Sequence, residues 1–274
     1  MTINCKGKLI DLSSPRVMGI INITPDSFFE GSRLQFEDDI ISRVGLMLEH
    51  GADFIDVGGY SSRPGAADVS ETEELDRVLP VVNAIIKNFP DCILSVDTFR
   101  SGVAKASFDA GAAMVNDISG GLLDREMIPT VGELGVPYII MHMKGQPQNM
   151  QEKTEYEDLL SDLLKYFSER MALARQHQIK DIIIDPGFGF AKTIEQNFEL
   201  LKKLDLLKIT EMPVLVGLSR KSMIYKTLKT DPEHALNGST ALHAIALSKG
   251  ANILRVHDVK EAVEVVTLFN SMNS

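Results

Sequence analysis

Eight short apolar runs, most of them ending in a polar residue, recur along the chain and constrain its fold more than any other feature. Each run is rich in Val or Ile and four to six residues long, which is typical of a buried parallel strand. The runs span Val17–Asn22, Phe54–Val57, Ile93–Asp97, Ala113–Asn116, Tyr138–Met141, Ile182–Asp185, Val214–Gly217 and Ile253–His257. The pattern predicts eight strands in one chain.

Amphipathic stretches long enough to be helices lie between these runs. They include Glu71–Asn88, Tyr156–His177, Glu195–Leu207 and Ala235–Lys249. Because strand and helix alternate eight times, we predict a single-domain (β/α)8 barrel, a TIM barrel, over residues 1–274. An open doubly wound sheet is the alternative. It lacks support because no Gly-x-Gly-x-x-Gly follows the first run, and Gly187–Lys192 breaks that pattern at its last position.

The length and charge of the chain narrow the classes of partner. The 274 residues suit one such barrel of about 250 residues. The net charge of −10 disfavours nucleic acid and anionic membranes as partners, so an anionic ligand needs a local basic pocket.

No apolar run approaches the roughly 20 residues of a membrane span. Two cysteines, Cys5 and Cys92, are too few for a disulfide framework. We therefore expect a cytoplasmic protein.

Polar side chains at the strand ends predict a ligand site. In a (β/α)8 barrel the loops after the strands build the active site. Side-chain alternation along each strand directs Asp97, Asn116 and Asp185 into the barrel mouth. Each of them alone could simply cap the next helix or turn. Together they indicate a ligand with many hydrogen-bond donors, such as the pyrimidinone ring of a pterin or guanine, because an unpaired buried carboxylate is costly.

A second cluster at the strand ends is cationic and hydroxylic. It comprises Gly217–Ser222 after the seventh run, with Arg220 and Lys221, and Arg255 and His257 after the eighth. Loops at these two positions often bind phosphate in such barrels. A plain N-cap followed by a solvated turn is the alternative for the first segment. Lys and Arg are unfavourable in the first turn of a helix, which favours an anion site.

Two long loops follow the first and second runs, at Thr24–Ser32 and Gly58–Ala66. Exposed aromatic residues flanked by Gly, Pro and Ser are typical of a lid, although ordinary surface loops have the same composition. Arg63 could clamp a departing phosphate. His142, between two methionines, is expected to be a packed core residue, and no role is assigned to the histidines in helical stretches.

The ordered motifs resemble those of the dihydropteroate synthase family over nearly the whole chain. They are Met18–Phe28, Ser61–Gly65, Ser95–Thr98, Val115–Asp117, Met141–Gly145, Asp185–Phe190, Ser219–Ser222, Asn237–Ser239 and Arg255–His257. The resemblance implies a (β/α)8 barrel that joins 6-hydroxymethyl-7,8-dihydropterin diphosphate to 4-aminobenzoate, releasing diphosphate and 7,8-dihydropteroate. It also implies a homodimer, the usual form of the family, and a target for sulfonamides.

The resemblance assigns residues to three subsites. The pterin would be bound by Asp97, Asn116, Asp185 and Lys221. Diphosphate would be bound by Asn22, Arg63, Ser219, Arg255 and His257. Aminobenzoate would be bound by Phe28, Ser62, Pro64, Phe190, Lys221 and Ser222. Mg2+ would bridge the diphosphate to the side-chain oxygen of Asn22. Asp97, Lys221, Arg63 and Arg255 would act in catalysis, and no general base is assigned.

The chain departs from the family pattern at two positions. Ser62 stands where the family usually has Thr, and it keeps the hydroxyl. Tyr60 stands where the family usually has Glu, and the sequence offers no interpretation of it. Two alternative functions remain: a methyltetrahydrofolate-type methyltransferase, which needs no diphosphate site, and a non-catalytic pterin-binding relative, which would have lost lid or anion residues. The segment Ser219–Ser222 and the Arg63 loop argue against both.

Overall fold

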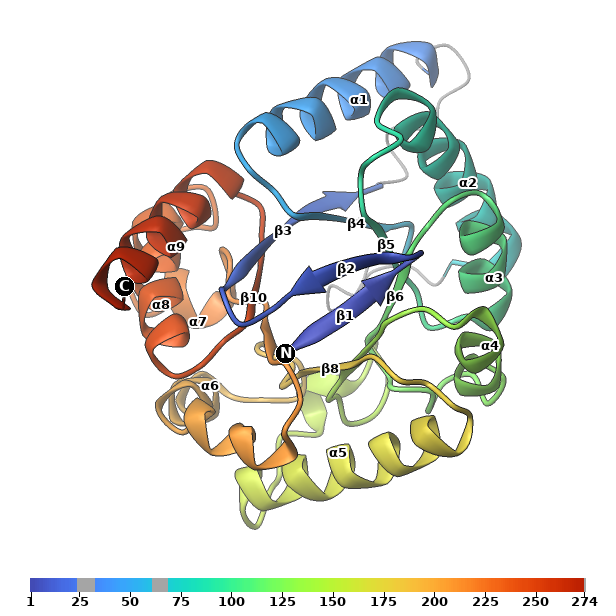
Figure 1. Ribbon diagram of the computed structural model, residues 1–274. Coiled ribbons are helices and arrows are strands. Elements are labelled where there is room, and N and C mark those ends of the chain that lie inside the picture. Colours follow the sequence, from blue (N-terminus) through green and yellow to red (C-terminus); the bar gives the residue numbers. More distant parts are fainter. Residues whose placement is uncertain (24–32, 61–68, 274) are drawn as a thin grey trace.

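Eight parallel strands form a ring with the helices around it (Figure 1). The computed structural model describes residues 1–23, 33–60 and 69–273. The strands pair in the order β8-β7-β6-β5-β4-β3-β10-β9. The ring is closed by a parallel bridge between Ile184 and Val214, next to which the amide of Ile184 donates to the carbonyl of Pro213 at 2.9 Å. The predicted single-domain TIM barrel is therefore confirmed.

The strands and helices alternate as the apolar runs predicted. The barrel strands are β3 (Arg16–Asn22), β4 (Phe54–Gly58), β5 (Leu94–Asp97), β6 (Met114–Asp117), β7 (Tyr138–Met141), β8 (Ile182–Asp185), β9 (Leu215–Val216) and β10 (Ile253–Val256). The α-helices are α1 (Arg33–Glu49), α2 (Glu71–Asn88), α3 (Ser101–Asp109), α4 (Met127–Leu134), α5 (Leu159–Gln176), α6 (Ile194–Lys202), α7 (Ser222–Tyr225), α8 (Leu236–Ser248) and α9 (Val259–Asn273). Short 3-10 helices span η2 (Met150–Glu152) and η3 (Leu204–Thr210).

The helix bounds follow local sequence signals, and two predictions were clearly too long. Helix α5 begins at Leu159, three residues after the predicted start at Tyr156. Helix α2 has the predicted bounds because Ser70 and Glu73 form a capping box at its start. The predicted helix Glu195–Leu207 is instead two elements, since α6 ends at Lys202 and η3 begins at Leu204.

An N-terminal hairpin closes one end of the barrel. Strands β1 (Thr2–Cys5) and β2 (Lys8–Asp11) pair antiparallel and lie across the ring of strands (Figure 1). Ile3, Cys5 and Leu12 are buried against the apolar residues inside the barrel. This hairpin was not predicted from the sequence. It covers the end at which the strands begin, so the opposite end is left for ligands.

The barrel interior changes from apolar to polar along the strands. Near the hairpin, the interior is filled by a cluster that includes Phe54, Met114, Ile183 and Ile253. Two residues further along the same four strands stand Asp56, Asn116, Asp185 and Arg255. Because alternate side chains of a strand point the same way, these four polar residues face the interior above the apolar layer. They define what we call the mouth, at the carboxyl ends of the strands.

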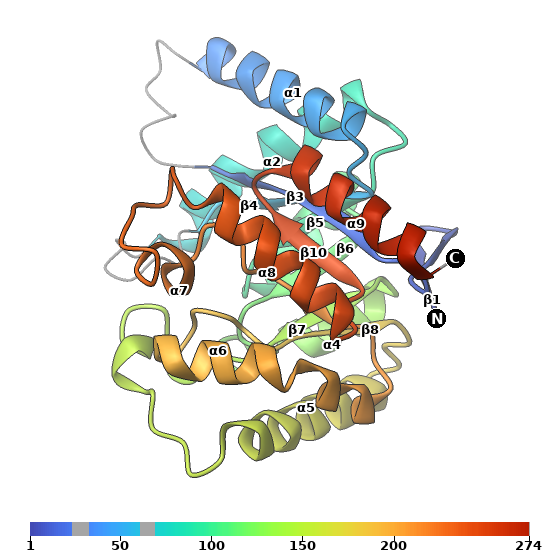
Figure 2. The same ribbon diagram turned by 90° about the vertical axis from the view of Figure 1, so that its left-hand side faces the viewer.

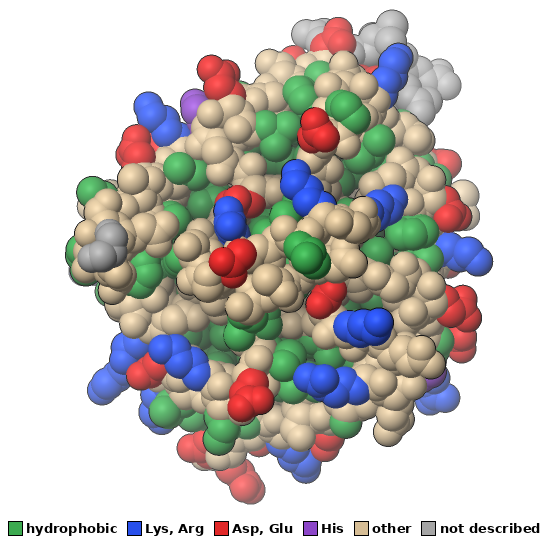
Figure 3. Space-filling view, in the orientation of Figure 1, with side chains coloured by type: hydrophobic (Ala, Val, Ile, Leu, Met, Phe, Trp, Pro, Cys, Tyr) green, Lys and Arg blue, Asp and Glu red, His purple; other side chains and the backbone are tan. Residues whose placement is uncertain are grey.

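The end of the molecule that carries the hairpin has an ordinary mixed surface. Acidic and basic side chains are interspersed over it (Figure 3). Within residues 1–23, 33–60 and 69–273, no helix combines the length and apolar character needed to cross a membrane.

Candidate active site

A buried arginine between two carboxylates forms the centre of the mouth. Arg255 at the end of β10 donates through Nε to Asp56 Oδ2 at 2.6 Å and through Nη2 to Asp97 Oδ2 at 2.5 Å. Asn116 on β6 donates through Nδ2 to the same Asp56 oxygen at 2.9 Å. Strands β10, β4, β5 and β6 are thus connected through their side chains, although β3 lies between β10 and β4 in the sheet. Within the described residues, Arg255 Nη1 has no hydrogen-bond partner and remains available to a ligand.

The pKa values of both Asp97 and Arg255 are raised, for different reasons. It raises the pKa of Asp97 to about 7, although the Arg255 guanidinium opposes the shift. Burial by itself would lower the pKa of Arg255. The charges of Asp56 and Asp97 outweigh burial and raise that pKa above its ordinary value. Arg255 therefore stays charged at all physiological pH values, while Asp97 can gain or lose a proton near pH 7.

Asp56 is a residue of the site that the sequence analysis missed. Its side chain is fully buried, and its Oδ1 has no hydrogen-bond partner in the described part of the chain. The signal was present in the run Phe54–Val57, because an Asp in the middle of an apolar strand has the same orientation as Phe54. A buried carboxylate is stable only when paired, and Arg255 supplies the pair.

Asp185 at the end of β8 and Lys221 before α7 are opposite charges that influence each other without a direct ion pair. Asp185 Oδ1 accepts from the amide of Gly187 at 2.8 Å, and burial raises the pKa of the carboxyl despite the opposing charge of Lys221. Lys221 Nζ donates to the carbonyl of Phe188 and lies 4.5 Å from the centroid of the Phe190 ring. Burial lowers the pKa of Lys221 to about 8, against the effect of Asp185. The structure thus brings Asp185, Lys221 and Phe190 together, as expected.

A buried lysine holds the loop after β8 in place. Lys192 Nζ lies 3.0 Å from the carbonyl of Gly187, 3.1 Å from that of Phe190 and 3.1 Å from His142 Nδ1. Burial lowers the pKa of Lys192 to about 7. The sequence analysis did not single out Lys192. His142 is 2% exposed and packs edge-on against Tyr166, so the expectation of a packed core histidine is confirmed.

Ser219 and His257 meet where β9 and β10 end. The amide of His257 donates to Ser219 Oγ at 3.2 Å, and His257 Nδ1 lies 3.1 Å from the same oxygen. Burial, with help from the nearby Arg255 charge, lowers the pKa of His257 to about 4. The imidazole is therefore neutral at pH 7, so the expectation that it adds positive charge to the mouth is wrong.

Arg220 does not contribute its charge to the mouth, which corrects the sequence-based expectation. Its Nε and Nη2 each donate to one carboxylate oxygen of Asp258 at 2.8 Å. Its Nη1 donates to the carbonyls of Pro232 and Glu233 at 2.9 and 2.8 Å. Sequence spacing could not show this, because the direction of the side chain is set by partners on other loops.

The remaining predicted residues fall into two groups. Asn22 is exposed at the last position of β3, on the strand face that Met18 shares, and Ser222 is the first residue of α7. The other four, Phe28, Ser62, Arg63 and Pro64, lie outside the described residues. Their predicted roles stay predictions.

Tyr60, which the sequence left without interpretation, connects three segments near the mouth. Its hydroxyl accepts from Gln148 Nε2 at 2.7 Å, and its ring packs edge-on against Phe99 at 5.0 Å between centroids. The guanidinium of Arg100 lies 5.6 Å from the centre of the Tyr60 ring, and it also forms an ion pair with the buried Glu74. Tyr60 thus joins the residues after β4, β5 and β7.

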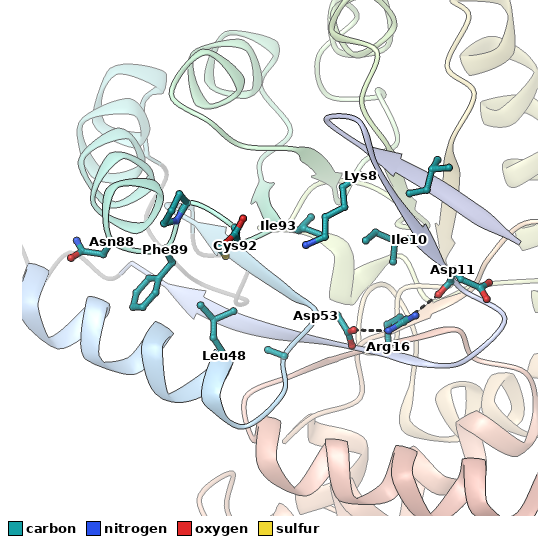
Figure 4. Close-up of a pocket in the computed structure, with 14 residues that line it drawn as sticks. Lys8, Ile10, Asp11, Arg16, Leu48, Asp53, Asn88, Phe89, Cys92 and Ile93 are labelled. Atoms are coloured by element: carbon teal, nitrogen blue, oxygen red, sulfur yellow. Dashed lines mark hydrogen bonds and ion pairs between the residues drawn. The ribbon is translucent and has the colours of Figure 1, made fainter.

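A cavity of about 730 Å³ lies at the opposite end of the barrel (Figure 4). It is lined by the hairpin, by the segment 88–93 and by an ion pair between Arg16 and Asp53 at 2.9 Å. None of the residues assigned to the three subsites lines this cavity. We therefore place the ligand site at the mouth, where the buried charges converge.

Comparisons with known proteins agree with this placement. The family of pterin binding enzymes matches residues 18–257. Dihydropteroate synthase of Escherichia coli strain K12 is 44% identical over 268 residues, which cover 97% of this chain and 94% of that protein. The structure of Yersinia pestis dihydropteroate synthase with a sulfonamide drug complex aligns with a TM-score of 0.93 at 43% identity, covering 100% and 99% of the two chains. That of the Xanthomonas albilineans enzyme with 4-aminobenzoic acid aligns with a TM-score of 0.91 at 38% identity, covering 100% and 98%.

The barrel and its mouth of buried Asp, Asn and Arg side chains define a pterin-binding enzyme. This class includes several chemistries, and overall sequence similarity distinguishes among them. With relatives more than 30% identical over nearly its full length, the chain belongs to the dihydropteroate synthase family, whose members are transferases. The alternatives of a methyltransferase and of a non-catalytic relative are therefore not supported.

Proposed function

We propose that the mouth binds 6-hydroxymethyl-7,8-dihydropterin diphosphate and 4-aminobenzoate and joins them to 7,8-dihydropteroate, with release of diphosphate. The observation that carries this proposal is the group of buried acceptors and cations at the strand ends, in a chain that is 44% identical to a dihydropteroate synthase. The same site would be the target of sulfonamides, because a relative has been solved with such a drug.

The pterin would be bound by Asp97, Asn116, Asp185 and Lys221. The pyrimidinone ring presents N–H and amino donors, for which carboxylate and amide oxygens are suitable acceptors. Charge-assisted hydrogen bonds are stronger than neutral ones, and both carboxylates are positioned by contacts within the protein. Lys221 supplies a donor for a ring acceptor on the same side of the mouth.

The diphosphate would be bound by Asn22, Ser219, Arg255, His257 and Arg63. Arg255 keeps Nη1 available, and neutral His257 can donate from Nε2 when its Nδ1 accepts from the Ser219 hydroxyl. The exposed amide oxygen of Asn22 is a ligand of the type that Mg2+ prefers, and Mg2+ commonly takes one or two protein ligands plus substrate phosphates. When bound, Mg2+ would neutralise charge on the departing oxygens.

The aminobenzoate would be bound by Ser222, Phe190 and the stem of Lys221, together with Phe28, Ser62 and Pro64. The start of α7 offers the hydroxyl of Ser222, and Phe190 offers an aromatic face that Lys221 already contacts at 4.5 Å. This pocket would lie next to the pterin residues, because Lys221 is assigned to both subsites.

The reaction needs charge stabilisation and placement more than proton transfer. The bond between the pterin methylene carbon and the diphosphate oxygen breaks, and both electrons leave with diphosphate. Arg255 and Arg63 would stabilise that departing charge. The neutral amine of aminobenzoate forms the new C–N bond and loses a proton to solvent or diphosphate. Asp97 would favour the positive charge that develops on the pterin, and the enclosed mouth would orient the two substrates.

We propose that the protein forms a homodimer through the face formed by α8 and the end of α9 (Figure 2). The thirteen residues of α8 contain no Asp, Glu, Lys or Arg, although Ala241, Ala244 and Ile245 on this helix are exposed. Leu268 and Met272 on α9 are 69% and 80% exposed. An uncharged, partly apolar helix on a surface is typical of an interface between subunits. Sedimentation of the purified protein would give its oligomeric state.

We propose a cytoplasmic location, where both substrates and Mg2+ would be available. Two free thiols, Cys5 and Cys92, and the family relationship support this proposal. No nucleic acid or membrane is proposed as a partner.

One assay tests the proposed reaction. Purified protein is incubated with Mg2+, dihydropterin diphosphate and labelled 4-aminobenzoate, and labelled dihydropteroate is separated by chromatography. Product formation that depends on both substrates is expected. A folded protein that forms no product would contradict the proposal.

A further inference from the structure

Three consecutive residues after β9 are each fixed by a different part of the molecule. Ser219 Oγ accepts from the amide of His257, at the end of β10. The amide of Arg220 donates to Ser239 Oγ in α8 at 2.9 Å. Lys221 Nζ donates to the carbonyl of Phe188, in the loop after β8. The loop 219–222 therefore depends on contacts outside itself for its conformation.

The backbone of this loop is strained at its centre. Arg220 has φ +55°, in the left-handed region that is unfavourable for a non-glycine residue. The Arg220 side chain is directed to Asp258 and to the carbonyls of Pro232 and Glu233, whereas Ser219 and Lys221 on either side of it belong to the mouth. A strained residue persists when its surroundings hold it, so the contacts of Arg220 are the ones to consider.

The guanidinium of Arg220 links the loop 219–222 to Asp258 and to the segment that contains Pro232 and Glu233. Nε and Nη2 form a two-pronged pair with both carboxylate oxygens of Asp258, and Nη1 donates to the carbonyls of Pro232 and Glu233. Both partners of the ion pair are partly buried, with side chains 25% and 19% exposed. Paired hydrogen bonds of this kind fix orientation as well as distance.

Asp258 connects this ion pair to the end of β10, the strand that pairs with β9. It follows His257 directly, and its carbonyl accepts from the amide of Ala262 in the first turn of α9. A shift of Asp258 would therefore move His257 and the end of β10, which carries Arg255. Helices α7, α8 and α9 lie side by side on this flank of the barrel (Figure 2).

The motif Asn237–Ser239 has no assigned contact with a substrate. It contributes to the same positioning of the loop 219–222. Ser239 is buried, accepts from the Arg220 amide and donates to the carbonyl of Ala235 at 2.9 Å. A Cβ on Gly238 would come within 2.4 Å of Ile224 Cγ2 in α7. The glycine thus permits α8 to approach α7, and the serine fixes the loop that precedes α7.

We propose that Arg220 and Asp258 are positioning residues: their ion pair holds the loop 219–222 at a fixed place relative to the end of β10, and so aligns Ser219 and Lys221 with Arg255. The inference rests on the proposed function for its effect on turnover. Arg220 acts here through the loop it orients, and its own charge is compensated by Asp258.

Steady-state kinetics of Arg220→Lys and Asp258→Asn test this proposal. Lysine keeps the charge but not the two-pronged geometry, so kcat/KM for both substrates should fall about tenfold or more. If Arg220 instead bound a substrate through its charge, Asp258→Asn would leave activity unchanged or raise it. The double variant Arg220→Lys/Asp258→Asn should lose no more than the worse single variant, because both substitutions break one pair.

Matched controls come from the other end of the same barrel. Arg16→Lys and Asp53→Asn alter a partly buried Arg–Asp pair that lines the cavity in Figure 4, and they should leave kcat/KM within about twofold of wild type. Single variants at Arg220 and Asp258 that change kcat/KM no more than these controls would overturn the proposal. The proposal would also be overturned if the losses of kcat/KM in the two single variants multiplied in the double variant.

Hydrogen exchange of the ligand-free protein separates this inference from the proposed reaction. Peptides covering residues 218–224 should exchange faster in Arg220→Lys and in Asp258→Asn than in wild type, whether or not the protein makes dihydropteroate. Unchanged exchange in these peptides would overturn the positioning role. A wild-type protein without activity would contradict only the proposed function.

Discussion

The two ends of the barrel use the same pair of residue types for different purposes. At the hairpin end, Arg16 and Asp53 form an ion pair with side chains 32% and 27% exposed. At the mouth, Arg255 is placed between Asp56 and Asp97, and Asp56 is fully buried. If the Arg16–Asp53 pair breaks, water can solvate both charges. The buried Asp56 has no access to water if it loses Arg255. The comparison shows that the mouth keeps charges where stability alone would favour apolar side chains.

The layers of the barrel explain this difference. Near the hairpin, Phe54, Met114 and Ile183 fill the interior, and the hairpin covers them. Two residues further along, the same strands carry Asp56, Asn116 and Asp185. The apolar layer supplies the stabilisation that permits the polar layer, since burial of each large apolar side chain contributes about 2 kcal/mol. The polar layer is available for binding.

Removal of Arg255 should give the largest difference between the two ends. Arg255→Met leaves Asp56 and Asp97 buried without their cation, which should destabilise the protein by about 3–5 kcal/mol. The pKa of Asp97 is already raised to about 7, and loss of the guanidinium raises it further. A carboxyl with a raised folded-state pKa favours the fold at low pH, and this contribution is lost as pH rises through that pKa.

The destabilisation caused by Arg255→Met should therefore be larger at pH 8 than at pH 5. Urea unfolding of both proteins at the two pH values measures it. An equal loss of stability at both values would contradict the account of the buried pair. Activity should also fall by about a hundredfold or more, because the diphosphate loses a cation.

A substitution at Lys221 should have an effect between those of Arg255→Met and Arg16→Met. Unlike Arg255→Met, it should stabilise the fold at pH 7. Burial lowers the pKa of Lys221 from 10.5 to about 8, which corresponds to a cost of roughly 3 kcal/mol for its charge. A lysine with a depressed pKa stabilises the fold above its unfolded pKa, and this is lost as pH falls through the folded value. At pH 7 the charged side chain thus destabilises the ligand-free protein.

Lys221→Met should raise the melting temperature of the ligand-free protein at pH 7 while it lowers kcat/KM about a hundredfold. The gain in melting temperature should shrink between pH 8 and pH 10. Calorimetry across this range measures it. A variant that is less stable than wild type at pH 7 would show that the contact with Phe188 outweighs the cost of burial.

Arg16→Met should have the smallest effect. The ion pair with Asp53 is partly exposed, so its loss should cost no more than about 1 kcal/mol and should diminish in high salt. Turnover should stay at the wild-type value, because the pair lies at the opposite end of the barrel from the mouth. A loss of turnover comparable to that of Arg255→Met would contradict the functional separation of the two ends.

Much of the fold could be predicted because its signals are local. Apolar runs of four to six residues indicate buried strands, and the box at Ser70 and Glu73 gives the start of α2. The hairpin was not predicted because only alternate residues of β1 are buried and β2 is mostly exposed, so neither strand is a continuous apolar run. Its burial depends on the barrel that it covers, which no local pattern encodes.

Part of the site could also be predicted, because strand periodicity is a local signal. Asp97, Asn116 and Asp185 could be placed at the mouth from strand periodicity alone. Asp56 was missed although its position in an apolar run is a readable signal. The direction of Arg220 could not be read, because its partner Asp258 lies 38 residues away. The pKa of His257 likewise depends on burial and on Arg255.

The affinity for dihydropterin diphosphate is the most direct test of whether the acceptors of the mouth recognise the pterin. Isothermal titration would compare wild type with Asp97→Asn at the mouth and Asp53→Asn at the hairpin end. Loss of a charged acceptor should weaken binding about tenfold or more in Asp97→Asn, and Asp53→Asn should bind as wild type does. Equal affinities of all three proteins, or an equal loss in both variants, would contradict the account.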